Sequence, residues 1–169
     1  MKRLVTIVGC LALLGAHVAN AQGSRVVGVW ELDVKASNLP PGFPAVSETR
    51  IYTRRDDGYL VVLAVRVDQR GNPDFIQIAA KSDGKDYPQY QSGPLAEFQI
   101  KGTSTPFTYS ETVVDENTVE AIAKWNGQVT NRGTRRISED GNRMVMTLKA
   151  VTPDGREIPF VLVFNRKHD

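Results

Sequence analysis

The sequence predicts an all-β protein built as one antiparallel up-and-down barrel of about ten strands. Short segments alternate between apolar and polar residues with a period of two, which is typical of strands with one buried face. Asn-Gly and Asp-Gly pairs separate many of these segments, and such pairs favour tight hairpins. About ten strands in an open sheet would leave exposed edges, which closure into a barrel removes; a two-sheet sandwich is the main alternative.

The N-terminal segment has the three parts of a secretory signal peptide. Lys2 and Arg3 precede an apolar run from Leu4 to Ala16, and small residues follow at Ala19-Asn20-Ala21. We therefore expect cleavage after Ala21, so that residues 1–21 are removed and residues 22–169 form a single periplasmic or secreted domain. The apolar run is shorter than the roughly 20 residues that span a bilayer, so no membrane span is expected.

Cys10 offers a second interpretation of this segment. Ile7-Val8-Gly9-Cys10 has the residue types of a lipoprotein cleavage box. Cleavage there would require an apolar region shorter than the usual 7–15 residues, roughly, so we prefer the ordinary signal peptide.

Removal of the signal peptide changes the charge and the reactive groups. The full chain has 21 Lys and Arg and 19 Asp and Glu, and loss of Lys2 and Arg3 leaves equal numbers. A mature chain of zero net charge gives no indication of nucleic-acid binding. Cys10 and His17 are lost as well, so His168, beside the C-terminus, is the last histidine. Disulfides, a His-based triad and an ordinary zinc or iron site are therefore excluded, and we expect no metal and no cofactor.

Ten segments show strand character and are bounded by turn residues. They are, in order, Gly28–Val34, Ser47–Arg54, Tyr59–Val67, Asp74–Lys81, Ala96–Lys101, Phe107–Val114, Thr118–Trp125, Gln128–Ser138, Arg143–Val151 and Glu157–Arg166. The turns between them include Asp56-Asp57-Gly58, Arg70-Gly71-Asn72, Asp83-Gly84, Asp115-Glu116-Asn117, Asn126-Gly127, Asp140-Gly141 and Asp154-Gly155. Two connections are long for a compact domain, Ser37–Ala45 and Ser82–Leu95, and long loops often frame binding sites.

Alternation assigns an apolar face to several strands. Three such faces are Tyr59/Val61/Leu63/Val65/Val67, Val119/Ala121/Ala123/Trp125 and Met144/Met146/Leu148/Ala150. The small residues among them, Ala121, Ala123 and Ala150, leave spare volume inside a barrel, although Trp125 and the methionines could fill it. The last strand is apolar on both faces around Val161 and Val163, which predicts either an additional cover, such as a helix, a loop or a second subunit, or simply β-propensity.

Gly28-Val29-Trp30 resembles the Gly-x-Trp motif of lipocalins. In that family the tryptophan closes one end of the barrel, and an arginine of the last strand packs against it. Arg166 stands in the matching place here, so the resemblance implies that Trp30 and Arg166 close this barrel.

Nearly all of residues 22–169 also resembles a group of small secreted bacterial lipocalin-like proteins. The matching residues are Trp30, Leu32, Asp83-Gly84-Lys85-Asp86-Tyr87-Pro88, Ser138-Glu139-Asp140-Gly141, Pro153-Asp154-Gly155 and Arg166. The resemblance implies export and a calycin-like barrel, of the lipocalin or fatty-acid-binding-protein type. It supplies no catalytic residues.

The candidate binding residues are polar or aromatic groups on faces that could point inward: Tyr87, Tyr109, Glu111, Trp125 and Arg135. If the Tyr109 face is interior, Glu111 and Arg135 could form a buried pair, because a buried arginine needs a partner. Such a pair could anchor the head group of a ligand. A shift of register by one residue would instead place both groups in water.

These observations leave three functions open. The first is a binding protein for a small apolar molecule, acting as a monomer or homodimer. The second is an enzyme that uses a lipocalin-like cavity for a cyclisation, isomerisation or decarboxylation. The third is an envelope interaction protein with a filled core. The first two require a cavity, and the enzyme also requires ionisable groups inside it.

Overall fold

The computed structural model describes residues 25–40, 43, 45–92 and 104–168. Within these residues, antiparallel strands close into one barrel, which confirms the predicted fold class. The strands are β1 (Gly28–Leu32), β2 (Ala45–Arg54), β3 (Leu60–Asp68), β4 (Pro73–Ala80), β5 (Tyr87–Gln91), β6 (Phe107–Val113), β7 (Thr118–Trp125), β8 (Gln128–Ile137), β9 (Arg143–Val151) and β10 (Glu157–Arg166). Each pairs with its neighbours in the chain, and β1 also pairs with β10, so the described sheet has no open edge.

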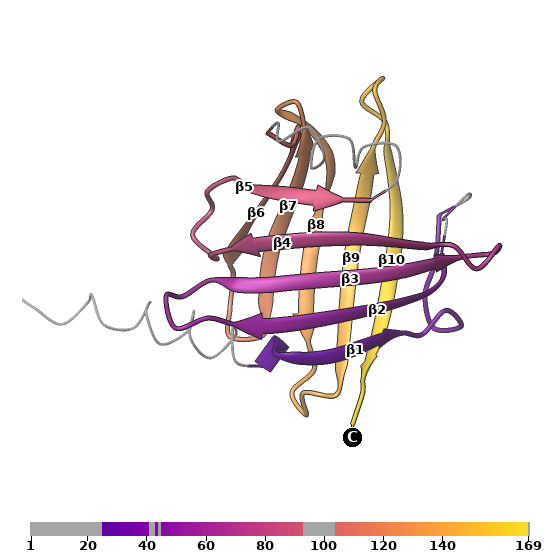
Figure 1. Ribbon diagram of the computed structural model, residues 1–169, viewed down its shortest axis with the longest axis vertical. Helices are drawn as coiled ribbons and strands as arrows, with labels where there is room; N and C mark the ends of the chain where they lie inside the picture. Colours follow the sequence, from indigo (N-terminus) through magenta and orange to yellow (C-terminus); the bar gives the residue numbers. More distant parts are fainter. Residues whose placement is uncertain (1–24, 41–42, 44, 93–103, 169) are drawn as a thin grey trace, which may run out of the picture.

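The barrel has two unlike ends. In Figure 1, β1 to β5 cross in front of β6 to β10 at a steep angle, as in a strongly tilted barrel. Because strand directions alternate, one end, here called the closed end, holds the start of β1 and the end of β10. The opposite end, here called the mouth, holds the β1–β2 connection and the hairpins after β7 and β9.

The predicted hairpin turns are confirmed. Asn126 and Gly127 join β7 to β8 with φ of 48° and 79°. Both angles are positive, as a two-residue turn of this kind requires, and few residues other than Asn and Gly accept them at low cost.

The fifth strand differs from the prediction. Residues 87–91, which we assigned to a long loop, form β5, whereas the predicted strand Ala96–Lys101 lies outside the described residues. The sequence of β5 does not show the usual pattern of a strand. Pro88 has no N–H to donate to a neighbouring strand, and Gln89 is a polar residue on the inner face. The connection predicted over Ser82–Leu95 is therefore not a single loop, since residues 82–86 turn at the closed end and residues 87–91 run along the barrel wall.

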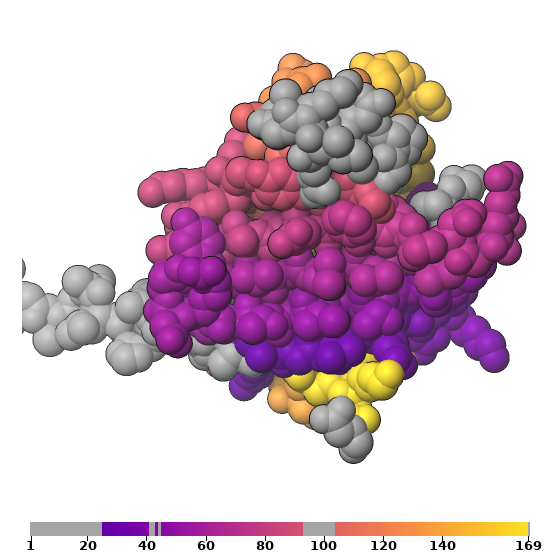
Figure 2. Space-filling view, viewed as in Figure 1, coloured from indigo at the N-terminus to yellow at the C-terminus, as the bar shows by residue number. Residues whose placement is uncertain are grey.

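The assignment of faces on β3 was wrong. Leu60, Val62 and Ala64 are buried, while Leu63 is 36% exposed and lies on the outer face. Both faces of β3 are apolar, so alternation alone could not select the inner one. Leu63 pairs with Ile51 of β2, and together they contribute to the outer wall of β1 to β4 that faces the viewer in Figure 2.

The closed end is filled by large side chains. Trp30, Ile137, Met144 and Phe164 are completely buried. The guanidinium of Arg166 lies 4.3 Å from the centroid of the Trp30 ring, in a cation–π arrangement.

Arg166 also holds the chain ends together. Its Nε donates to the carbonyl of Gly141, and its terminal nitrogens donate to the carbonyls of Val27 and Arg25. A Cβ at Gly28 would lie 2.5 Å from Nη1 of Arg166, which explains why a glycine precedes the tryptophan by two residues.

The connection after β1 runs along the last strand. The backbone of Asn38 forms a bridge with Val161, and Ser37 Oγ accepts a hydrogen bond from the amide of Val163. Val163 is 4% exposed although its neighbours Leu162 and Phe164 fill the inside. Of the covers considered for the double apolar face of this strand, the structure shows a loop.

Candidate ligand-binding site

A cavity of about 140 Å³ lies inside the barrel. Its apolar lining comes from two opposite parts of the wall. Strands β3 and β4 contribute Val62, Ala64, Ile76 and Ile78, and strands β7 and β9 contribute Ala121, Ala123, Met146 and Leu148. Four polar residues complete it: Arg50, Gln89, Tyr109 and Asn131.

Small side chains create this space. Ala121 and Ala123 of β7 line the cavity, as their inward positions predicted, and Ala64 of β3 adds to it. Ala150, the third predicted position, is not part of the lining. The closed end is packed with larger groups, so the free volume lies where alanines replace them.

Trp125 does not enter the cavity, and this prediction was wrong. It is 48% exposed and stacks on Phe107, with ring centroids 6.5 Å apart. Trp125 is the last residue of β7, next to the hairpin at the mouth, where the wall ends. A bulge between β7 and β8 also shifts the register beyond Ala123, so simple alternation fails at this position.

Arg50 supplies a permanent cation at the cavity wall. Its Nε lies 2.5 Å from Glu48 Oε1, and its Nη1 lies 3.2 Å from the sulfur of Met146. The guanidinium is also 5.0 Å from the centroid of Phe164. Burial opposes the charge, but the interactions with Glu48 and Tyr52 together outweigh it and raise the pKa of Arg50 above its usual value.

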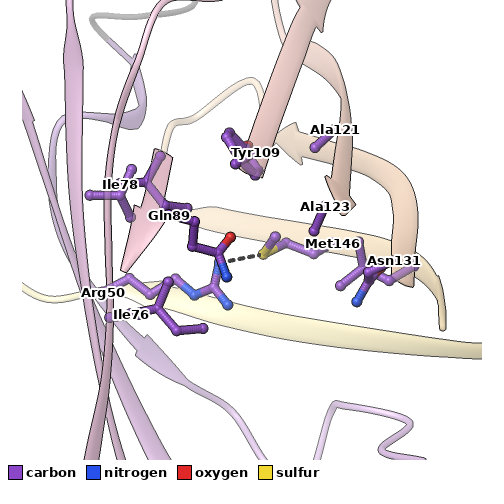
Figure 3. Close-up of a pocket in the computed structure, with 12 residues that line it drawn as sticks. Arg50, Ile76, Ile78, Gln89, Tyr109, Ala121, Ala123, Asn131 and Met146 are labelled. Carbon is purple, nitrogen blue, oxygen red and sulfur yellow. Dashed lines mark hydrogen bonds between the residues drawn. The ribbon is translucent and has the colours of Figure 1, made fainter. Parts of the chain in front are cut away.

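Asn131 brings an unpaired acceptor to the cavity. Its Oδ1 is buried and has no hydrogen-bond partner within the described part of the chain. An unpaired buried polar atom costs about 1–3 kcal/mol, so such atoms need an explanation. Asn131 is on β8 and Arg50 on β2, which are well separated around the ring of strands. In Figure 3 the two side chains approach the cavity from different sides.

Glu111 and Arg135 form the interior pair that the alternation on β6 and β8 suggested. Arg135 Nη2 lies 3.2 Å from Glu111 Oε2, and each side chain is 2% exposed. Glu111 also accepts hydrogen bonds from Tyr109 at 2.8 Å and from Ser82 at 2.5 Å. The guanidinium of Arg135 lies 5.2 Å from the ring centroid of Tyr52. Neither Glu111 nor Arg135 lines the cavity, so the pair supports the wall behind it.

Tyr109 connects this pair to the cavity, because it lines the space and donates to Glu111. Burial, together with the negative charge of Glu111, raises the pKa of Tyr109 well above 10. The phenol is therefore neutral near pH 7.

Tyr87, the remaining candidate, lies away from the cavity. Its hydroxyl donates to Asp83 at 2.9 Å, and its ring meets Tyr59 edge-on at 5.7 Å between centroids. These contacts hold the turn that leads into β5. They give Tyr87 a structural role at the closed end.

The sequence analysis missed Glu48, Arg50 and Gln89. Glu48, Arg50 and Tyr52 alternate along β2 and all point inward, against an outer face of Thr49, Ile51 and Thr53. That alternation is visible in the sequence, but the sequence analysis assigned no inner face to this strand. A charge-balanced Glu-x-Arg pair beside an inward tyrosine is the signal that could have identified this face.

No group of three or more His, Cys, Asp and Glu side chains suited to a metal occurs among the described residues. The same part of the chain contains no helix that is long and apolar enough to cross a membrane.

Comparison with solved structures finds other proteins with the same barrel architecture. The sequence matches no protein-family model and no curated protein. The crystal structure of the fluorescent protein UnaG is similar with a TM-score of 0.54 at 15% identity, over 85% of this chain and 98% of UnaG. Rv2717c from M. tuberculosis is similar with a TM-score of 0.51 at 12% identity, over 86% of this chain and 94% of that protein. What these proteins share is the barrel. At such identities the likeness concerns fold alone.

Proposed function

We propose that this protein binds a small, mainly apolar molecule inside the barrel. The observation that carries the proposal is a cavity whose wall is largely aliphatic but which contains an unpaired polar atom, Asn131 Oδ1, and a permanent cation, Arg50. Apolar pockets with a few convergent polar groups are typical of small-molecule sites.

The size of the cavity limits the ligand. A dry apolar cavity of about 150 Å³ accepts a molecule such as benzene. The cavity here has about 140 Å³, so a ligand of about one ring fits without rearrangement.

The site favours binding over the enzymatic alternatives. Among the described residues, the ionisable groups that line the cavity are Arg50 and Tyr109. The pKa of each is raised, so Arg50 remains a cation and Tyr109 remains a neutral phenol near pH 7. General acid–base catalysis works best with groups whose pKa lies near the working pH.

We further propose that the protein acts outside the cytoplasm. The support is the signal-peptide pattern of residues 1–21, with cleavage after Ala21 and not at Cys10. These residues lie outside the described part of the chain. N-terminal sequencing of the exported protein should begin at Gln22, and a lipidated Cys10 would contradict this proposal.

Thermal unfolding of residues 22–169 with a panel of single-ring compounds tests the binding function. A ligand at about 100 times its Kd stabilises a protein by roughly 2.7 kcal/mol, so binding should raise the Tm measurably. Ala121→Leu places a larger side chain in the cavity and should abolish the shift. Ala79→Leu, at an exposed position on β4, makes the same change outside and should leave it intact. A Tm that no compound raises, or a shift that persists in Ala121→Leu, would contradict the proposal.

A further inference from the structure

Two polar groups of the cavity need opposite partners. Arg50 donates through Nη1 to the sulfur of Met146, and a thioether is a weak acceptor. A carbonyl oxygen in its place would be a much stronger one. Asn131 Oδ1 has no donor within the described residues and is buried. A bound molecule that satisfied both groups would accept a hydrogen bond at Arg50 and donate one at Asn131.

The positions of these groups separate the two requirements in space. Arg50 comes from β2 and Asn131 from β8, with β1, β10 and β9 between them on the shorter way around the barrel. Figure 3 shows Met146 between the labelled side chains of Arg50 and Asn131 in projection. One ligand that reaches both sides therefore carries its acceptor and its donor on different atoms.

The charges of the interior decide between a neutral and an anionic ligand. The cavity cation Arg50, whose side chain is 14% exposed, is paired with Glu48, and Arg135 is paired with Glu111. Three of these four groups, Glu48, Glu111 and Arg135, are each at most 2% exposed. A carboxylate entering this site would add a charge with no free counter-charge among these pairs, and the loss of its hydration would oppose binding.

We infer that the cavity selects a neutral, ring-sized molecule that carries a carbonyl acceptor for Arg50 and an N–H donor for Asn131, such as a carboxamide, over hydrocarbons, ketones and carboxylates. The inference rests on the proposed binding function and names the chemistry of the ligand for the same site. The carbonyl oxygen faces the guanidinium of Arg50, the N–H faces Oδ1 of Asn131, and the ring lies against the aliphatic wall. Asn131 and Arg50 are then the residues that determine specificity.

Four probes with one ring each test this assignment. Toluene has neither polar group, acetophenone has only the acceptor, benzamide has both, and benzoate replaces the amide by a charge. Calorimetric titration of residues 22–169 should give benzamide a Kd at least about tenfold lower than acetophenone or benzoate. Acetophenone should in turn bind more tightly than toluene.

Substitutions assign each preference to its residue. Asn131→Leu should remove the preference for benzamide over acetophenone while leaving acetophenone affinity within about twofold. Gln77→Leu, an exposed amide on the outer face of β4, is the matched control and should change neither affinity. The double variant Glu48→Gln/Arg50→Met removes both charges together and should reduce the advantage of acetophenone over toluene.

The outcomes separate this inference from the proposed function. If toluene and acetophenone bind but benzamide binds no better, or if benzoate binds most tightly, the assignment of the ligand class is wrong and the binding function stands. If Asn131→Leu leaves the benzamide preference intact, Asn131 is not its acceptor and the inference fails. If none of the four probes binds, both proposals are overturned.

Discussion

Arg135 and Glu111 meet inside the barrel, 3.2 Å apart and each 2% exposed. The attraction of Glu111, together with Tyr52 and Tyr109, outweighs the burial that opposes the charge and raises the pKa of Arg135 above its usual value. Arg135 therefore keeps its charge in the folded protein. The pair joins β6 to β8 across β7 and holds Tyr109 at the cavity wall.

Loss of one member of this pair should be much worse than loss of both. Glu111→Gln leaves Arg135 as a buried charge without its counter-ion, and we expect a loss of about 3–5 kcal/mol in the free energy of unfolding. Glu111→Gln/Arg135→Met removes both charges and should recover most of that loss. Urea denaturation of the variants measures both values, and a double variant as unstable as the single one would show that the charges themselves matter little.

The proximity of Gly28 to Arg166 predicts that a side chain at position 28 destabilises the protein. Gly28 has φ of +131°, and a Cβ there would lie 2.5 Å from Nη1 of Arg166. Gly28→Ala should therefore cost about 1–3 kcal/mol through backbone strain, in addition to displacing Arg166 from Trp30.

Gly71→Ala is the control for backbone strain alone. Gly71 also has positive φ, +83°, but no atom lies within 4 Å of an added Cβ. Chemical denaturation should show a clearly larger loss for Gly28→Ala. Equal losses would mean that the proximity of Arg166 contributes nothing.

Gly133 of β8 lies so close to the backbone of β9 that no side chain fits there. A Cβ at this position would lie 2.0 Å from the carbonyl oxygen of Thr147 and 2.8 Å from Cα of Leu148, both backbone atoms of β9. Gly133→Ala must therefore push two paired strands apart, and we expect a loss of about 3 kcal/mol. Because Leu148 lines the cavity, probe affinity should fall in the same variant. Thr134→Ala on the next residue provides the comparison, and a similar effect from both changes would contradict this explanation.

The raised pKa of Tyr109 predicts how the free energy of unfolding changes at alkaline pH. Its pKa is raised well above 10 in the folded protein, first by burial and then by the charge of Glu111. A group with a raised pKa contributes its stability fully below the unfolded pKa, about 10, and loses that contribution as pH rises towards the folded value. The free energy of unfolding should therefore decline above pH 10.

Tyr109→Phe isolates this effect. The variant lacks the buried phenol, so its stability should decline less between pH 10 and 11 than that of the original chain. Urea denaturation across that range, with tyrosinate absorbance as a second signal, measures the difference. The same slope in both proteins would exclude Tyr109 as the cause, and Tyr90→Phe serves as a comparison at another tyrosine.

The alternation of residues was sufficient wherever the two faces of a strand differ. Val119 and Ala121 on β7, and Met144, Met146 and Leu148 on β9, point inward as predicted because the other face of each strand is mainly polar or charged. The same reasoning brought Glu111 and Arg135 together. It failed on β3, where both faces are apolar, and it made no assignment on β2, where the inner face is the more polar one.

The sequence by itself determined the class of fold. The signals for it were period-two alternation, Asn-Gly and Asp-Gly turns, and the residues Gly28, Trp30 and Arg166. Alternation and turns are local features, because sterics and solvation act on each segment separately. Only the tertiary structure decided where the fifth strand lies, that a cavity of about 140 Å³ remains, and that Arg50 and Asn131 reach it from β2 and β8. These properties depend on closure. The volume left inside a barrel is set by all the inward side chains together, and the partner of a buried polar atom is set by strands far apart in the chain.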